Sequence, residues 1–418
     1  MLASLFICIS LTQVLNAEVR SGLDVVVAEN FKRFQGKRVG LITNHTAVAR
    51  NGKHIADLFH EAPGVQLKAL FGPEHGIRGE AEAGAKIATQ IDAKTGVPIH
   101  SLYGKTYKPT REMLEGLDAL VFDMQDVGAR FYTYISTMSL ALEAAAENDL
   151  EFYILDRPNP ISGRVEGPVL DKQHRSFVGI HPIALRHGMT IGELASMFVG
   201  EKWAWRSSLD SSAAQRPDIA WNKLHVVALE GWSRRQFFHQ TNLPWIAPSP
   251  NMTNETAALL YPGICLLEAT NFSEGRGSQQ PFEIVGAPWC EHEKVAALLK
   301  DKLAGLAIET TTFTPQDLPG KAMNPKFEGE LCHGLRFKIT APEKFEAVKL
   351  GVALLWALHK THPDKLEISE RRMARLFGAA WLRAMLLSGA DLSLLWQRLE
   401  EDAARFQQAR AKYLLYGD

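Results

Sequence analysis

The chain has 418 residues, of which 46% are hydrophobic and 22% are charged, a balance typical of a globular protein. This length exceeds what one ordinary core holds and predicts two domains. The 46 Lys and Arg residues nearly cancel the 47 Asp and Glu residues. Because there is no basic surplus, neither a nucleic acid nor an anionic membrane is favoured as a partner, and we expect a neutral or weakly charged small molecule.

The first 17 residues have the pattern of an export signal. An apolar run from Leu2 to Leu11 precedes polar residues and Ala17, a small residue at which a signal peptidase could cut. No Lys or Arg precedes the run, and a buried N-terminal strand is the alternative interpretation. We predict a signal peptide over residues 1–17 and an exported protein, periplasmic or secreted. Cys8 lacks the context of a lipoprotein, and no other stretch is long enough to span a bilayer, so no stable membrane anchor is expected.

Four short apolar runs in the first part of the chain each continue into a polar loop and then into a helical stretch. Continuous apolar strands that alternate with helices are typical of a parallel sheet covered on both faces. We therefore predict an α/β fold with a Rossmann-like parallel sheet. The predicted strands are 39–42, 67–71, 119–122 and 152–155.

In such sheets a ligand binds outside the carboxyl ends of the strands. All four polar loops follow their strands, so their side chains should gather at one edge of the sheet. The site residues expected on this argument are His45, Glu74, His75, Asp123, Gln125, Asp126, Arg157 and Asn159.

Helical patterns dominate the later part of the chain. Thr190 and Glu193 have the spacing of a capping box, which predicts a helix start. Apolar residues at 3–4 spacing predict a helix over 345–355 that stops before Pro363. We place a catalytic domain at 18–285 and a smaller C-terminal α/β auxiliary domain at 286–418. Other predicted features are helices over 136–148 and 392–413 and an exposed loop over Ser207–Pro217.

The sharpest local signal is Gly72-Pro-Glu74-His75-Gly76. A carboxylate between glycines at the end of a strand is poorly placed to support a core, whereas glycines allow a tight turn and close approach of a ligand. A surface turn with a capping Glu is the alternative. We interpret Glu74 as a catalytic acid whose pKa is raised by burial beside Phe71 and Pro73, with His75 orienting it or binding substrate.

The segment Asp123–Tyr134 is the second signal, with two carboxylates, an amide, an arginine and two tyrosines directly after a strand. Glycoside hydrolysis needs one group that protonates the leaving oxygen and another that activates water or attacks carbon. Asp123, Asp126 or Tyr132 could be that second group, and Tyr132 or Tyr134 could stack on a sugar. For Asp126 and Arg130 a structural salt bridge is the alternative.

Three later loops add candidates, and several familiar motifs are absent. His187 precedes the capped helix, where an anion could bind, while Asn251, Glu274 and Arg276 lie in rigid or glycine-rich turns. The chain has no GxSxG, GxGxxG, GxxxxGK[ST] or HExxH string, so no nucleotide cofactor is expected. The three cysteines after residue 17 lack zinc spacing and are interpreted as buried thiols.

Longer strings in the chain resemble one enzyme family. They are GLITNHTAV, LFGPEHGIRGE, VFDMQDVGARFYTYISTM, LDRPNPISG, RHGMTIGELA, PWIAPSPNM and LLYPGICLLEATNFSEGRGSQQPFEIVGAPW. In order and content they resemble the exo-β-N-acetylmuramidase family (NamZ-type, glycoside hydrolase family 171), from about Gly22 to Tyr416. The polar segment Trp203–Asn222 departs from it, since similar sequences are shorter there.

The resemblance implies a Rossmann-like catalytic domain and a C-terminal auxiliary domain. It also implies release of N-acetylmuramic acid from the non-reducing ends of peptidoglycan fragments of the MurNAc-GlcNAc type. We expect a monomer or homodimer without a cofactor. The resemblance places the catalytic glutamate at Glu74 and leaves Tyr132, Asp123 and Asp126 as candidates for the second group. For the lactyl carboxylate of muramic acid, an arginine fork is expected from Arg276, Arg157 or Arg130. The substrate-binding candidates are Asn44, His45, His75, Gln125, Arg130, Tyr134, Arg157, Asn159, His187, Asn251, Glu274 and Arg276.

Two other functions are compatible with the same residues. Two α/β lobes around a cleft would suit a non-catalytic periplasmic muropeptide-binding or sugar-binding protein, which would bind tightly without turnover. A metal-dependent hydrolase could use His45, His75 and Asp123, although their spacing forms no metal motif.

Overall fold

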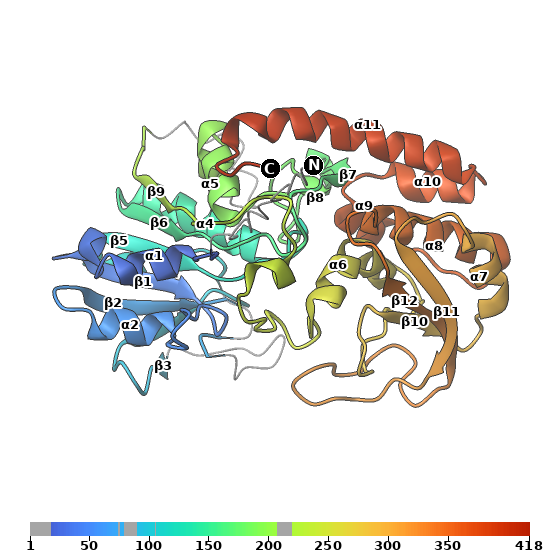
Figure 1. Ribbon diagram of the computed structural model, residues 1–418, viewed down its shortest axis with the longest axis horizontal. Coiled ribbons are helices and arrows are strands. Elements are labelled where there is room, and N and C mark those ends of the chain that lie inside the picture. The colour runs from blue at the N-terminus through green and yellow to red at the C-terminus, as the bar shows by residue number, and fades with distance from the viewer. Residues whose placement is uncertain (1–17, 74–75, 79–89, 105, 207–219) are drawn as a thin grey trace, which may run out of the picture.

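The computed structural model describes residues 18–73, 76–78, 90–104, 106–206 and 220–418. The predicted signal peptide and the predicted loop over Ser207–Pro217 lie outside these residues. Figure 1 shows a large sheet with its helices at the left, a smaller sheet with its helices at the right, and helix α11 along the top from α5 to the right-hand end.

The large sheet has seven strands in the order β3-β4-β2-β1-β5-β6-β9, and all neighbours are parallel except β3 and β4. Leaving out the short edge strand β3, the chain fills one side of β1 first and then the other, which is the strand order of Rossmann folds. The predicted α/β class and parallel sheet are confirmed. The strands are β1 Arg38–Thr43, β2 Gln66–Gly72, β3 Gln90–Ile91, β4 Pro98–Ser101, β5 Ala119–Asp123, β6 Glu151–Leu155 and β9 Leu224–Val227.

Helices cover both faces of this sheet, which explains why its strands are apolar on both sides. On one face α1 and α2 form a buried cluster with side chains such as Leu41 and Val121. On the other face α4 and α5 pack against side chains such as Phe122 and Phe152. The helices are α1 Gly22–Ala28, α2 Ile55–Glu61, α3 Arg111–Leu114, α4 Tyr134–Glu147 and α5 Ile191–Gly200, and a two-stranded ribbon of β7 Glu166–Val169 and β8 Ala184–Arg186 precedes α5.

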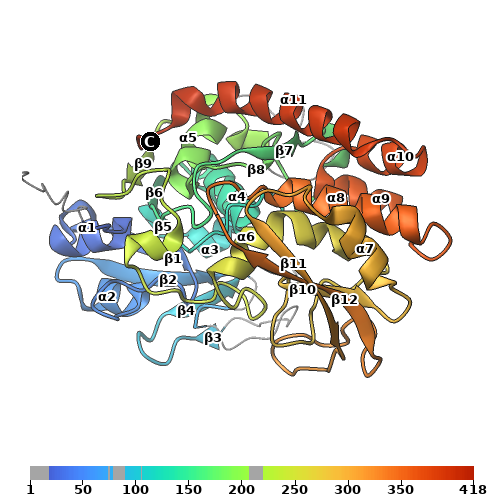
Figure 2. The same ribbon diagram turned by 45° about the vertical axis from the view of Figure 1, so that its right-hand side comes forward.

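The C-terminal half contains a three-stranded antiparallel sheet in the order β10-β12-β11. Helix α7 packs against β11 and β12 of this sheet, and α8 packs beside α7 and α6 (Figure 2). The elements are α6 Glu255–Ile264, β10 Ile284–Ala287, α7 His292–Leu299, β11 Leu306–Phe313, β12 Cys332–Ile339, α8 Ala347–Thr361, α9 Glu370–Phe377, α10 Trp381–Leu387 and α11 Leu392–Arg410. In the described part of the chain, no helix combines the length and apolar character needed to cross a membrane.

A pair of glycines lets α6 and α8 approach each other closely. A Cβ atom on Gly263 would lie 1.9 Å from the carbonyl oxygen of Ala347, and one on Gly351 would lie 2.4 Å from the carbonyl oxygen of Gly263. Side chains at either position would force the helices apart, so these glycines fix how α6 meets the buried helix α8.

The predicted helices are present, with boundaries shifted by a few residues. Thr190 and Glu193 form the capping box of α5, as the sequence predicts. The predicted helix over 345–355 is α8, which extends beyond that range to Thr361. Cys265, Cys290 and Cys332 are buried free thiols, which confirms their interpretation.

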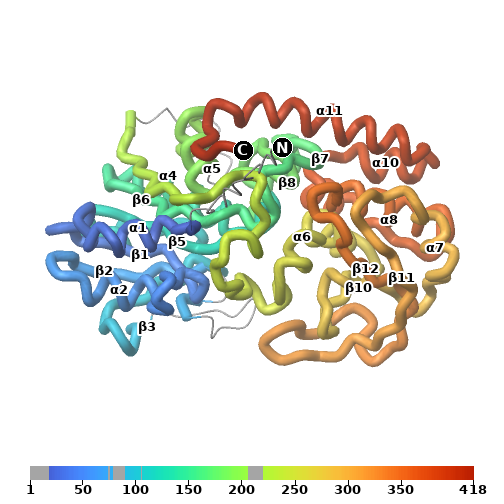
Figure 3. The backbone as a smooth tube through the Cα atoms, viewed as in Figure 1, coloured from blue at the N-terminus to red at the C-terminus, as the bar shows by residue number. Residues whose placement is uncertain are grey.

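The last residues of the chain return to the large sheet. Helix α11 runs from the C-terminal half back toward α5, and the C-terminus ends there (Figure 3). The Tyr416 hydroxyl donates to Asp156 Oδ2 at 2.6 Å and accepts from the Leu229 amide at 3.0 Å, and the Leu415 amide donates to Glu193 Oε1 at 2.8 Å. The two halves are therefore joined by buried polar contacts as well as by apolar packing.

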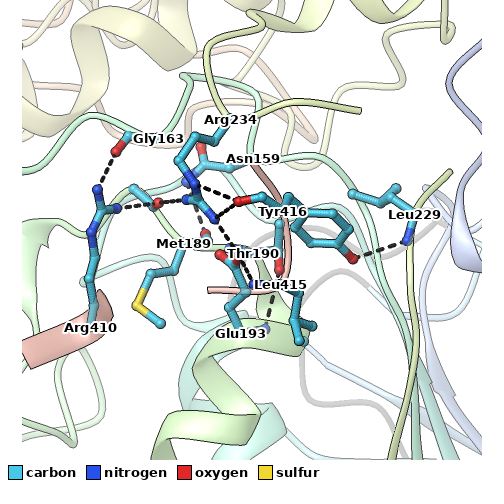
Figure 4. Close-up of polar contacts among 12 residues, drawn as sticks. Asn159, Gly163, Met189, Thr190, Glu193, Leu229, Arg234, Arg410, Leu415 and Tyr416 are labelled. Carbon is cyan, nitrogen blue, oxygen red and sulfur yellow. Dashed lines mark hydrogen bonds and ion pairs between the residues drawn. The ribbon is translucent and has the colours of Figure 1, made fainter. Parts of the chain in front are cut away.

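Two arginines complete this junction (Figure 4). Arg234 donates to Glu193 Oε1 and to the Tyr416 carbonyl oxygen at 3.1 Å. Arg410, at the end of α11, donates to the carbonyl oxygens of Gly163 at 2.8 Å and His187 at 3.0 Å. Because guanidinium groups present several donors in fixed directions, two of them satisfy carbonyls from three separate segments.

Candidate functional site

The loops that follow β1 and β5 are tied together at the carboxyl edge of the large sheet. Thr43 Oγ1 donates to the Asp123 carbonyl oxygen at 2.9 Å, and the Gln125 amide donates to Thr46 Oγ1 at 2.9 Å. The order of the chain reverses between these two strands, where ligands bind in folds of this type. The polar loops after β1, β5 and β6 therefore meet at one edge, as the strand pattern predicts.

Tyr134 connects this edge to a cavity between the two halves. Its hydroxyl accepts from Asn44 Nδ2 at 2.7 Å and donates to the Pro248 carbonyl oxygen at 2.7 Å. Asn44 is itself oriented, since its Oδ1 accepts from the Thr46 amide at 3.0 Å. The tyrosine ring is therefore fixed by partners on two separate loops.

Asp123 and Arg157 form a buried ion pair at the sheet edge. Arg157 Nε contacts Asp123 Oδ1, and Arg157 Nη2 lies 3.1 Å from Asp123 Oδ2. Burial raises the pKa of Asp123, and the charge of Arg157 opposes this effect. Both carboxylate oxygens are engaged by the guanidinium, which leaves this acid less free for chemistry than its sequence position suggests.

Asp126 and Tyr132 keep polar atoms without partners. Asp126 Oδ2 accepts from the Gly128 amide at 2.7 Å, but its buried Oδ1 has no hydrogen-bonding partner among the described residues. The Tyr132 hydroxyl is buried and also makes no hydrogen bond of good geometry within the described parts of the chain. Burial raises the pKa of Tyr132 well above its ordinary value, and the neighbouring Tyr134 adds to this effect. The Tyr132 hydroxyl is therefore protonated in the protein without a ligand. Buried polar atoms without partners call for an explanation, and a bound ligand is one.

His187 lies beside Asp126. Its Nε2 is 3.7 Å from Asp126 Oδ2 and has no hydrogen bond to the described residues, while its Nδ1 accepts from the Met189 amide at 3.1 Å. His187 and Asp126 therefore lie side by side, and His187 Nε2 and Asp126 Oδ1 each lack a hydrogen-bonding partner among the described residues.

Arg130 is placed away from these groups. Its Nη1 donates to the carbonyl oxygens of Pro168 at 2.9 Å and Ile183 at 3.0 Å, and its Nη2 donates to the carbonyl oxygen of Leu376 at 2.9 Å. Burial lowers its pKa to about 9. These contacts join the large sheet's loops to α9, and the predicted alternative of an Arg130–Asp126 salt bridge is not among them.

Three other candidates bond mainly to the backbone. Such contacts shape the loops that carry the site. They are His45 Nε2 with the Ala247 carbonyl oxygen at 2.8 Å, Gln125 Nε2 with that of Pro158 at 2.9 Å, and Asn159 Nδ2 with that of Met189 at 3.0 Å.

A cavity of about 130 Å³, which we call the aromatic cavity, lies between the halves. It unites four sequence candidates: Tyr132, Tyr134, Asn251 and Arg276. The Tyr132 and Tyr134 rings meet edge to face with centroids 4.8 Å apart, a favourable geometry that holds both rings in place. The lining is completed by residues 131, 133, 249, 250, 252, 261 and 282.

Arg276 separates the aromatic cavity from a second one. Its Nη2 donates to Glu268 Oε1 at 2.8 Å, its Nε lies 3.3 Å from Glu274 Oε1, and its guanidinium lies 5.2 Å from the centre of the Phe282 ring. Although burial opposes it, the charges of Glu268 and Glu274 raise its pKa. Nη1 has no partner among the described residues. The guanidinium is therefore held in place by the two glutamates, while the N–H groups of Nη1 remain available to a ligand.

The second cavity, which we call the polar cavity, measures about 370 Å³. It is lined by Glu268, Glu274, Arg276 and residues 320–326, which belong to the loop between β11 and β12. Asn251 Nδ2 from the aromatic cavity donates to the Lys321 carbonyl oxygen at 2.7 Å. The two cavities are thus neighbours that share Arg276 and are joined by Asn251.

Glu74 and His75 lie outside the described residues. Strand β2, which precedes them, pairs with β1 up to Phe71 and Ile42. The strand thus ends at the same edge of the sheet as Asn44. Among the described residues no three His, Cys, Asp or Glu side chains are grouped to hold a metal ion.

Family models match both halves of the chain. Residues 39–256 match the model described as exo-beta-N-acetylmuramidase NamZ, N-terminal, and residues 259–416 match the corresponding C-terminal model. The chain belongs to the exo-β-N-acetylmuramidase NamZ family. The two models meet between residues 256 and 259, and the boundary predicted near residue 285 falls within the stretch matched by the second.

Individual relatives agree with this membership. The chain is 43% identical over 402 residues to the peptidoglycan beta-N-acetylmuramidase NamZ of Bacillus subtilis strain 168, covering 96% of this chain and 92% of the relative. Two crystal structures of DUF1343 family proteins from Bacteroides fragilis NCTC 9343 are similar to it. One has a TM-score of 0.84 at 35% identity over 96% of this chain and 99% of the other, and the second has 0.76 at 34% over 96% and 100%. The predicted family, fold class and glycosidase class are confirmed.

Sequence reasoning missed several residues that line the two cavities of this NamZ-family chain. Tyr261, Glu268 and Phe282 lie in apolar or mixed segments without a local motif, and Lys321 lies in a loop 45 residues after Arg276. The only available signal was indirect: Tyr261 and Glu268 fall inside the long family-like string that also carries Arg276.

Proposed function

We propose that this NamZ-family protein is an exo-acting glycosidase that releases N-acetylmuramic acid from the non-reducing ends of peptidoglycan fragments. The observation that carries the proposal is Arg276, which lines a cavity together with Tyr132 and Tyr134 and whose Nη1 has no partner among the described residues. Muramic acid differs from glucosamine by a lactyl ether with a carboxylate, and an open guanidinium N–H can bind that carboxylate through a charge-assisted hydrogen bond. The tyrosine faces offer an apolar surface for the sugar ring.

In the proposed mechanism Glu74 protonates the glycosidic oxygen as the bond to the anomeric carbon breaks. Charge then develops on the sugar ring, as in glycosidases generally. The second group, which activates the attacking water or itself attacks the anomeric carbon, is proposed to be Asp126, whose buried Oδ1 has no partner in the described structure, or Tyr132, which must first give up the proton that burial holds on it. Asp123 is the weaker candidate, since Arg157 engages both of its oxygens.

We also propose that the protein works outside the cytoplasm, in the periplasm or after secretion. The support is the apolar run at the start of the chain, followed by Ala17. A monomer or homodimer without a stable membrane anchor remains part of this proposal.

The experiment uses the chain from residue 18 with a chromogenic aryl N-acetylmuramide and the matching N-acetylglucosaminide. Release of the chromophore from the muramide alone is expected, because only that substrate carries the carboxylate. Equal release from both would remove the role given to Arg276. Tight binding of muropeptides without release from either would instead support the sugar-binding alternative.

A further inference from the structure

The polar cavity extends the candidate site beyond one sugar. We infer that it binds the N-acetylglucosamine that is linked to the terminal N-acetylmuramic acid, and that the loop over residues 314–331 selects for this second sugar. The inference rests on the proposed function, and it assigns a ligand to a cavity that the terminal sugar does not require.

Size supports a site with two parts. Small-molecule sites usually measure about 300–1,000 Å³, whereas the aromatic cavity alone measures about 130 Å³. The neighbouring polar cavity, at about 370 Å³, already lies within that range by itself and is large enough for a further part of the ligand. Arg276 lines both cavities, so a ligand that is bound beside it in the aromatic cavity can extend directly into the polar cavity.

The chemistry of the polar cavity suits a neutral sugar with many hydroxyl groups. Hydroxyls both donate and accept hydrogen bonds. Glu268 Oε2 has no partner among the described residues and can accept from a sugar hydroxyl. Glu274 is held by Arg276 and by Lys326 Nζ at 3.0 Å, and Lys326 is fixed in turn by the Phe272 carbonyl oxygen at 3.0 Å. Ion pairs therefore hold these polar groups in place before a ligand arrives.

The 314–331 loop forms the remaining wall and is anchored at several points. It lies at the lower edge of the small sheet in Figure 1. The Gln316 amide donates to the Gly277 carbonyl oxygen at 2.8 Å, close to Arg276 in the chain. Asn251 Nδ2 holds the Lys321 carbonyl oxygen at 2.7 Å, so the loop is positioned by a residue of the aromatic cavity. Lys321 and Met323 are exposed along the cavity and can contact the second sugar.

The test compares two substrates that differ only in the group linked to the anomeric carbon of the muramic acid. One is the disaccharide MurNAc-GlcNAc, and the other is the aryl N-acetylmuramide, which lacks the second sugar. For the double variant Lys321→Ala/Met323→Ala, the ratio of kcat/KM for the disaccharide to that for the aryl substrate should fall about tenfold, mainly through KM. Both residues are exposed, so folding should persist. Glu328→Ala, on the same loop but outside the cavity lining, is the matched control.

A second measurement uses free N-acetylglucosamine as an inhibitor of aryl substrate hydrolysis. It should inhibit the unaltered protein and the Glu328→Ala control, and inhibit the double variant about tenfold more weakly. An unchanged substrate ratio, or equal losses on both substrates, would overturn the inference, because the cavity would then hold nothing or part of the muramic acid itself. If the unaltered protein hydrolyses neither substrate, the proposed function fails rather than the assignment of this cavity.

Discussion

The Tyr416 hydroxyl donates to Asp156 Oδ2 at 2.6 Å, which bonds the third residue from the C-terminus to the residue that follows strand β6. Asp156 Oδ2 also accepts from Thr190 Oγ1 at 2.7 Å, and its Oδ1 accepts from the Gly192 amide at 2.9 Å. One buried carboxylate thus holds together the sheet edge, the start of α5 and the end of the chain. Arg157, the partner of Asp123, is the next residue along the chain.

Replacing Tyr416 with Phe should weaken the folded protein. The substitution removes a donor to a buried carboxylate and the acceptor of the Leu229 amide. We expect the free energy of unfolding to fall by about 1.5–3 kcal/mol, as for hydrogen bonds to charged groups, measured by urea denaturation. Tyr413→Phe is the control, because its hydroxyl bonds the more exposed Glu201 and its loss should cost about 1 kcal/mol or less. Equal effects would show that the tail is not held by Asp156.

Asp156 should also make stability depend on pH. Burial raises its pKa from 3.8 to about 6, despite donors from Thr190 and Tyr416. Because the folded state holds this proton more tightly than the unfolded state, stability from this group is greatest below pH 3.8 and is lost as the pH rises to about 6. The loss should reach about 3 kcal/mol. In Asp156→Asn, the change in unfolding free energy between pH 3.8 and about 6 should become more positive by that amount, and an unchanged pH dependence would contradict the assignment.

Asp123 and Asp126 should respond differently to replacement by Asn. Asp123→Asn leaves the buried Arg157 without its counter-charge, so unfolding free energy should fall by about 3–5 kcal/mol. Asp126→Asn removes no ion pair to Lys or Arg in the described structure and should cost much less stability while lowering kcat. Thermal unfolding and kinetics on the aryl N-acetylmuramide separate the two. A stable, inactive Asp123→Asn would restore Asp123 as the second catalytic group.

The sequence predicts those features whose pattern lies within a few neighbouring residues, and it does not predict contacts between residues far apart in the chain. Strand β5 and the loop with Asp126 are predictable because an apolar run and its polar continuation are adjacent in the chain. The capping box of Thr190 and Glu193 is predictable for the same reason, because its two residues are close together in the chain. The contact between Tyr416 and Asp156 spans 260 residues and has no local pattern, so only the folded chain reveals it. Likewise, the sequence presents Arg276 as a candidate but not its pairing with Glu268 or its place between two cavities.

Arg276→Lys should separate charge from geometry at the proposed lactyl site. Lysine keeps the positive charge but cannot contact Glu268, Glu274 and a carboxylate with one planar fork. We expect KM for the aryl N-acetylmuramide to rise about 10- to 100-fold with a smaller change in kcat. Arg371→Lys, at an exposed position on α9, is the matched control. A KM equal to that of the unaltered protein would show that Arg276 does not bind the substrate carboxylate.

Glu74→Gln tests whether Glu74 is the general acid, by comparing two substrates whose leaving groups differ in their need for a proton. Without a proton donor, kcat for MurNAc-GlcNAc should fall about 10²- to 10⁴-fold, the usual contribution of a general acid. A nitrophenolate leaves without protonation, so the loss on a nitrophenyl N-acetylmuramide should be much smaller. The unfolding midpoint should match that of the unaltered protein, and Glu328→Gln, at an exposed position, controls for the loss of one charge. Equal losses on both substrates would instead assign Glu74 to attack on the anomeric carbon, and near-normal turnover of the disaccharide would remove it from the mechanism.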